Sequence, residues 1–213
     1  MLSVRSALED TWVDVTALRT GLVDLLAGLP DDVWDAPSLC PGWRVRDVAA
    51  HVLLPPRLNL LAVPGLVRTR FDLARYVHDD AVHRAEAPVP ALLTAFRHAV
   101  DRRWLPPTRR PEHLLADLYI HTQDIRRPLG LPAPSDAGLL RAVLETVVGD
   151  RVIGDPARTA GLRLVATDLD WTSGDGPEVA GPADALILTL SGRRVALGEL
   201  AGPGVPTLEA RLP

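Results

Sequence analysis

Three side chains have the residue types and the spacing of a divalent-metal site. Asp117 and His121 lie four residues apart in ADLYIHTQDIRRPLG, residues 116–130, and a helix would put them on one face, about 6 Å apart along its axis. His51 lies on an apolar stripe near the end of WDAPSLCPGWRVRDVAAHV, residues 34–52. Two imidazoles and a carboxylate leave one zinc coordination position for water or substrate, as in catalytic zinc sites. The sequence therefore predicts a metal site at His51, Asp117 and His121.

Other interpretations of these residues stay open on spacing alone. A histidine on an apolar helix face is commonly a core residue that is hydrogen-bonded to a backbone carbonyl. Asp117 and His121 could also form a helix-stabilising ion pair. His113 lies four residues before Asp117, but it is about 12 Å along the helix axis from His121, so these two histidines can hardly bind the same ion.

Three residues near the predicted ligands have both a structural and a chemical interpretation. Cys40 has no neighbour in the sequence that resembles an activating base, which favours a structural role over a nucleophilic one. Trp43 is expected to pack the loop onto the helices, with stacking on a cofactor as the alternative. Asp124 is expected to form a salt bridge, with a hydrogen bond to a ligand histidine as the alternative.

Apolar periodicity and helix breakers predict the elements that position these residues. Helices are expected over 3–28, from Arg44 to about Val52, in part of 57–86, and over 89–104, 112–127 and 138–148. After about Asp155 the pattern changes and predicts a strand at 162–171, a helix at 183–190 and a final strand at 208–212. The expected fold is α+β, with a helical bundle in residues 1–155 and a small α+β domain in residues 156–213.

The composition of the chain excludes several classes of function. The 213 residues are 47% hydrophobic and 23% charged, which is typical of a globular protein, and the net charge of −4 gives no basic surface for nucleic acid or an anionic membrane. All 23 basic residues are arginines, so Schiff-base chemistry on a lysine is excluded. The single cysteine excludes an internal disulfide. No signal peptide or apolar run of about 20 residues is present, so we expect a cytoplasmic protein without membrane partners.

The motif PSLCPGWRVRDVAAHV, residues 37–52, resembles the signature of the mycothiol-dependent maleylpyruvate isomerase family, an actinobacterial group within the DinB-like metal-binding superfamily. Residues 116–130 are similar to the helix that supplies the family's remaining metal ligands. GPEVAGPADALILTLSGR, residues 176–193, resembles its C-terminal domain. The resemblance implies a DinB-like four-helix bundle in residues 1–155 and a sterol-carrier-like α+β domain in residues 156–213.

The resemblance also implies a set of ligands for one divalent metal, usually zinc. The family binds this ion with a histidine from the second helix and a Glu-x-x-x-His pair. These positions correspond to His51, to Asp117 in place of the glutamate, and to His121. Aspartate is one methylene shorter than glutamate and reaches less far, so this departure bears on metal affinity and metal choice.

The activity that the resemblance implies is a thiol chemistry on a bound cofactor. In the family the metal binds mycothiol, a cysteine-sugar thiol, and coordination makes this thiol a thiolate at neutral pH. A thiolate can add to an activated double bond, allow rotation and leave, which isomerises a small electrophile such as maleylpyruvate; retention of the adduct would make the protein an S-transferase. We expect a monomer or homodimer. A hydrolase that uses metal-bound water and a non-catalytic metal-binding protein remain the alternatives.

Overall fold

The computed structural model describes residues 2–55, 62–105 and 109–213. It divides into two compact units, Met1–Pro107 with His121–Leu131, and Thr108–Ile120 with Pro132–Pro213. The division falls within one helix, α6 (Pro111–Arg126), so residues of this helix belong to both units. The predicted domain boundary between residues 155 and 156 stays a prediction.

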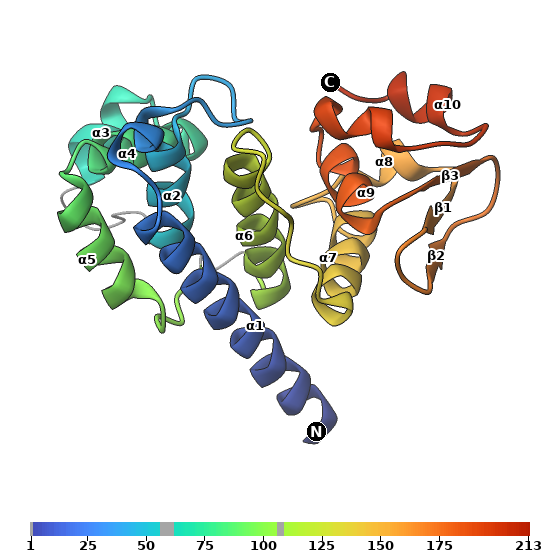
Figure 1. Ribbon diagram of the computed structural model, residues 1–213, viewed down its shortest axis with the longest axis horizontal. Helices are drawn as coiled ribbons and strands as arrows, with labels where there is room; N and C mark the ends of the chain where they lie inside the picture. The colour runs from blue at the N-terminus through green and yellow to red at the C-terminus, as the bar shows by residue number, and fades with distance from the viewer. Residues whose placement is uncertain (1, 56–61, 106–108) are drawn as a thin grey trace. The chain divides into compact units, whose positions relative to one another are not determined.

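The regular elements described in the first unit are helices (Figure 1). They are α1 (Leu2–Ala27), the 3-10 helix η1 (Asp31–Asp35), α2 (Val45–Leu53), α3 (Val63–Arg68), α4 (Leu73–Ala85), α5 (Val89–Ala99) and the second part of α6. Helix α2 packs mainly against α4, and α1 packs against α5. Their core includes Trp34, which is fully buried and stacked on Phe96 with ring centroids 6.3 Å apart. Burial of aromatic side chains of this size contributes strongly to the stability of the unit.

The start of α2 is fixed by a charged pair between Arg44 and Asp47. The carboxylate of Asp47 accepts hydrogen bonds from the backbone nitrogen of Arg44 at 2.8 Å and from its guanidinium at 2.9 Å. A carboxylate in the first turn of a helix also interacts favourably with the positive end of the helix dipole. Hydrogen bonds to Asp47 and then to Glu86 raise the pKa of Arg44 above its ordinary value. The chain leaves the helix in an extended conformation at Leu54, immediately before Pro55.

The second unit contains a three-stranded mixed sheet with helices. Its elements besides the first part of α6 are α7 (Ala137–Gly149), α8 (Pro156–Thr159), β1 (Arg163–Ala166), β2 (Trp171–Ser173), β3 (Glu178–Gly181), α9 (Ala183–Leu190), the 3-10 helix η3 (Arg194–Glu199) and α10 (Val205–Glu209). Strand β1 is central, antiparallel to β2 and parallel to β3. Every residue of α9 is buried, and this helix packs against α7 and the sheet. The protein is α+β, with a mostly helical N-terminal region.

The structure confirms the predicted helix at 183–190 and corrects both predicted strands. The expected strand at 162–171 is too long: β1 occupies its first part and ends at Ala166, and a turn then leads to β2 at Trp171. In that turn, Asp168 accepts a hydrogen bond at 2.8 Å from the backbone nitrogen of Ala183, the first residue of α9. The expected strand at 208–212 is also wrong: α10 ends at Glu209 inside this range and a turn follows it, and the proline at the start of α10 favours a helical φ.

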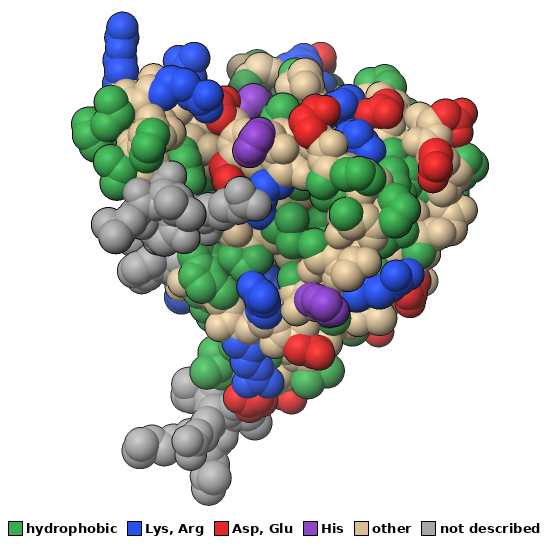
Figure 2. All heavy atoms as spheres, turned by 90° about the vertical axis from the view of Figure 1, so that its left-hand side faces the viewer, with side chains coloured by type: hydrophobic (Ala, Val, Ile, Leu, Met, Phe, Trp, Pro, Cys, Tyr) green, Lys and Arg blue, Asp and Glu red, His purple; other side chains and the backbone are tan. Residues whose placement is uncertain are grey.

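The other helices agree with the sequence pattern to within a few residues, with two exceptions. Helix α5 ends at Ala99, five residues before the predicted end at Trp104. The expected helical segment at 57–86 contains α3 and α4 in its described part, and residues 57–61 lie outside the described residues. None of the described helices has the length and hydropathy that a membrane crossing requires. On the face drawn in Figure 2, basic and acidic side chains are interspersed with hydrophobic ones.

Candidate metal centre

Helix α6 carries three polar side chains on one face, one on each of three successive turns. Asp117, His121 and Asp124 follow one another by four and three residues. Buried apolar residues such as Leu118 and Ile125 anchor the helix. Its path therefore fixes the spacing of the three polar groups along one side.

The three predicted metal ligands come together. Single ligand atoms of His51, Asp117 and His121 all lie within 4.8 Å of one another, and we call this group the His51 site. The rings of His51 and His121 meet edge to face, with centroids 5.0 Å apart. Ligands of one tetrahedral zinc ion lie about 3.3–3.6 Å apart, so small side-chain rotations suffice to place this group around an ion. All three residues are partly exposed, which leaves the group accessible to a small molecule.

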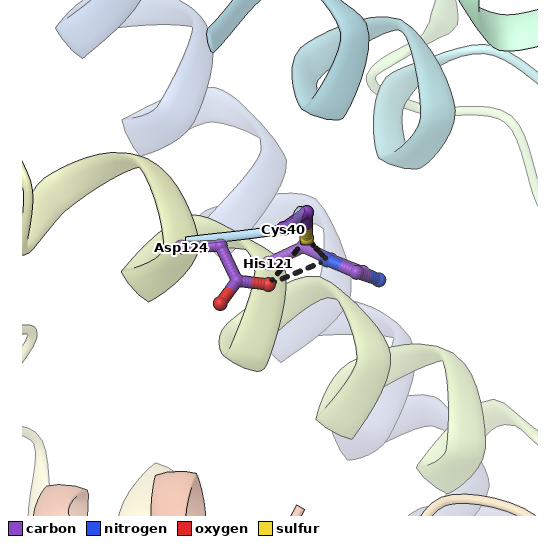
Figure 3. A group of neighbouring side chains, drawn as sticks. All are labelled: Cys40, His121 and Asp124. Carbon is purple, nitrogen blue, oxygen red and sulfur yellow. Dashed lines mark hydrogen bonds and ion pairs between the residues drawn. The ribbon is translucent and has the colours of Figure 1, made fainter. Parts of the chain in front are cut away.

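A second group lies at the Nδ1 atom of His121 (Figure 3). Asp124 Oδ2 lies 2.8 Å from this nitrogen, and the Cys40 thiol donates to the same oxygen at 3.1 Å. Cys40 Sγ is also 3.5 Å from His121 Nδ1. Figure 3 shows the second ring nitrogen of His121 on the side away from Cys40 and Asp124. We call Cys40, His121 and Asp124 the Cys40 site.

Asp124 contacts the imidazole of His121, which is the less expected of its two sequence-based interpretations. Its side chain is fully buried and pairs with His121, a predicted ligand, three residues away on the same helix. A carboxylate on one ring nitrogen fixes the histidine tautomer and increases the basicity of the other nitrogen. The contact of Asp124 with Nδ1 therefore holds the imidazole of His121 in one orientation.

The loop before α2 is held in place around Cys40 by hydrogen bonds. The backbone nitrogen of Leu39 donates to the backbone oxygen of Asp124 at 3.0 Å, which joins the loop to α6. The hydroxyl of Ser38 accepts from the backbone nitrogen of Cys40 at 3.1 Å and donates to the backbone oxygen of Trp43 at 2.8 Å. The bond between Leu39 and Asp124 joins two segments that are distant in the sequence, and the two local bonds of Ser38 hold the loop around Cys40.

The ring of Trp43 lies among three imidazoles. Its centroid is 5.1 Å from that of His51, 5.2 Å from that of His78 and 6.3 Å from that of His121. Trp43 therefore packs on two predicted ligands as well as on the helices. His78, on α4, was not singled out by the sequence because no spacing rule links α4 to the motifs. Its side chain is 51% exposed and pairs with Asp79.

His113 forms a separate, structural pair. Its side chain is 4% exposed, and its Nε2 lies 2.8 Å from a carboxylate oxygen of Asp150. Arg110 also reaches this carboxylate, at 2.7 Å. A backbone hydrogen bond from Val152, followed by the contact with His113, lowers the pKa of Asp150 below its ordinary value. The other ring nitrogen, Nδ1, accepts a hydrogen bond from the backbone nitrogen of Arg110, so both ring nitrogens of His113 have polar partners.

Comparison with known proteins places the chain in a class of α+β proteins that have a helical N-terminal domain. The model of the mycothiol maleylpyruvate isomerase N-terminal domain matches residues 15–126, a range that includes the whole His51 site and Cys40 site. This chain belongs to that family.

Two solved structures share the fold. They are the crystal structures of the mycothiol-dependent maleylpyruvate isomerase, with a TM-score of 0.61, and of its mutant with one histidine changed to alanine, with a TM-score of 0.60. Each is 16% identical to this chain, and each alignment covers 92% of this chain and 92% of the other. At this identity the similarity establishes the fold. No curated protein matches the chain.

Proposed function

We propose that this protein is a metal-dependent enzyme that uses mycothiol to isomerise, or to transfer sulfur to, a small electrophilic substrate of the maleylpyruvate type. The observation that carries the proposal is the convergence of His51, Asp117 and His121 within 4.8 Å, inside the region that matches the family. The same proposal includes a DinB-like four-helix bundle in residues 1–155, a sterol-carrier-like domain in residues 156–213, and a cytoplasmic monomer or homodimer.

The donor atoms of the His51 site suit a divalent ion, most simply Zn²⁺. Two imidazole nitrogens and one carboxylate oxygen are a common zinc ligand set that leaves a coordination position for an exogenous ligand. The contact of Asp124 with His121 Nδ1 supports Nε2 of His121 as the ligand atom. Asp117 supplies the single negative charge of the set, so a bound divalent ion would keep a net positive charge.

Each nearby side chain has a defined task in this proposal. When bound, the ion would lower the thiol pKa of mycothiol from about 8.5, which supplies a thiolate at neutral pH. Asp124 keeps the proton of His121 on Nδ1. Trp43 covers the imidazoles of His51 and His121 and limits the entry of water. Cys40 donates its thiol hydrogen to Asp124, so the proposal assigns the nucleophile to mycothiol and not to Cys40.

The use of mycothiol is tested by isothermal titration of the zinc-loaded protein with mycothiol, with the zinc-free protein titrated in parallel. We expect heat of binding for the zinc-loaded form alone, and slower alkylation of the bound thiol. The alkylation assay uses Cys40→Ser, because Cys40 is the only cysteine of the chain and its removal leaves mycothiol as the reacting thiol. Equal heats with and without zinc, together with unchanged alkylation rates, would contradict the proposal.

A metal-dependent hydrolase is the second candidate, because the partial exposure of all three ligands also admits water. Zinc-bound water acquires a pKa of about 7 and can attack a substrate. This candidate predicts turnover of ester or amide substrates with added metal and no thiol, and a bell-shaped pH profile. A rate that is indifferent to mycothiol would favour it over the first proposal.

A further inference from the structure

The Cys40 site contains a complete set of donors of its own. Its thiol, imidazole and carboxylate come from two segments of the chain and meet at three short distances: 3.5 Å from Sγ to Nδ1, 3.1 Å from Sγ to Oδ2, and 2.8 Å from Nδ1 to Oδ2. We propose that Cys40, His121 and Asp124 bind a thiophilic divalent cation, and that this ion competes with the His51 site for the imidazole of His121.

The distances are close to those around a bound ion. Zinc bonds of about 2.3 Å to sulfur and about 2.0–2.1 Å to nitrogen and oxygen give tetrahedral edges of about 3.3–3.6 Å. The Sγ–Nδ1 distance of 3.5 Å already equals such an edge. The other two are shorter by about 0.4–0.5 Å because hydrogen bonds now join those atoms. An ion that replaces these hydrogens needs only a small expansion of the site.

The charges of the Cys40 site favour a divalent ion. Binding releases the thiol proton of Cys40 to solvent and moves the imidazole proton of His121 from Nδ1 to Nε2. The resulting thiolate and the carboxylate of Asp124 together neutralise a double positive charge. Because Asp124 is fully buried, this neutrality avoids the cost of an unpaired charge away from water. A thiolate also selects soft cations over Mg²⁺ or Ca²⁺.

The backbone holds this site in advance of binding. The 3.0 Å bond from Leu39 to the backbone oxygen of Asp124 fixes the loop against α6 on one side of Cys40. The 3.1 Å bond to the hydroxyl of Ser38 fixes the backbone of Cys40 itself. Little conformational freedom remains to be lost when an ion binds, which increases affinity.

One imidazole cannot serve both sites in its neutral form. Nε2 binds an ion only when the proton is on Nδ1, whereas the Cys40 site needs Nδ1 as an acceptor and the proton on Nε2. This competition, which rests on the proposed function of the His51 site, means that an ion on Cys40 leaves the first site with only His51 and Asp117. A thiophilic ion would therefore displace the metal of the His51 site.

The test is a Co²⁺ titration of the full-length, metal-free protein, followed by absorption. Cys40 is the only cysteine, so any thiolate-to-cobalt charge-transfer band in the near ultraviolet reports this site alone. His51→Ala, with its fold checked by circular dichroism, should show the band and saturate near one equivalent. His51→Ala/Cys40→Ser and His51→Ala/His121→Ala should lose it. Absence of the band in His51→Ala at saturating Co²⁺ overturns the proposal.

Two further variants separate this proposal from the proposed function. Asp117→Asn disables the His51 site with a nearly isosteric side chain and should show the same band if His51→Ala does not fold. Cys40→Ser should bind Co²⁺ without the band, through the His51 site. A band in Asp117→Asn together with no Co²⁺ binding by Cys40→Ser would support the proposed Cys40 site and contradict the proposed His51 site. No band in Asp117→Asn together with Co²⁺ binding by Cys40→Ser would overturn the proposed Cys40 site alone.

Discussion

At the scale of single residues, His121 connects the two groups of polar side chains. Its Nδ1 faces the buried carboxylate of Asp124, while its ring packs against His51. The sequence indicated His51, Asp117 and His121 because helical spacing and a family motif are local signals. It could not indicate that Cys40 touches Asp124, 84 residues away, since that contact depends on how the loop packs on α6.

In a Cys40→Ser background, where the Cys40 site cannot bind the ion, Asp124→Asn is expected to weaken zinc binding by about 10- to 100-fold, the usual effect of removing a partner that orients a ligand histidine. The amide keeps the shape of the side chain but loses the charge that increases the basicity of His121. Zinc affinity can be measured by competition with a chromophoric chelator. Asp79→Asn is the matched control, because Asp79 pairs with a histidine outside the His51 site, and it should leave the affinity unchanged. Equal zinc affinities for the Asp124→Asn and Asp79→Asn variants would contradict the role assigned to Asp124.

At the scale of elements, the helices were the predictable part. Amphipathic periodicity and proline or glycine breakers gave α2, α6 and α9 nearly as they are. The strands were less predictable because they are only three or four residues long. Strand β3 lies in a stretch rich in turn residues, and its parallel pairing with β1 is a non-local feature that no alternation pattern encodes. In α10, a short apolar alternation was equally compatible with helix and strand.

The pair between His113 on α6 and Asp150 after α7 makes an element-scale prediction about pH. The pKa of Asp150 is lowered in the folded protein, so its ionised form stabilises the fold above the unfolded pKa of about 3.9, and this contribution is lost as pH falls through the lower folded pKa. Asp150→Asn should therefore lower the free energy of unfolding at pH 7 by about 1 kcal/mol, the net value of a typical hydrogen bond.

Urea unfolding of wild type and Asp150→Asn from pH 7 down to the acid limit of the folded state measures this difference. The two curves should begin to converge only as pH falls below about 4, and they should meet below the folded pKa of Asp150, where the carboxylate of the wild type is protonated. Asp136→Asn keeps its helix-cap oxygen and serves as a control for the loss of one negative charge. A stability difference that stays constant, or grows, as pH falls would contradict the assigned role of Asp150.

At the scale of the whole molecule, the family match and the fold agree with the sequence motif. The motif at residues 37–52 lies within the matched region, and the structural similarity extends over 92% of the chain. The α+β class followed from the change of pattern after the helical region, because helical and strand periods differ. The order of the strands and the division of α6 between two units could not follow, since both depend on contacts between distant segments.

The most direct measurement of the central claim is the zinc content of purified protein in a Cys40→Ser background, where the Cys40 site cannot substitute for the His51 site. We predict about one zinc per chain in Cys40→Ser and in Cys40→Ser/His98→Ala, which removes an exposed histidine outside both sites. Cys40→Ser/His51→Ala should retain its circular dichroism spectrum and lose the metal. Equal zinc content in the His51 and His98 variants would contradict the claim that His51, Asp117 and His121 share one ion.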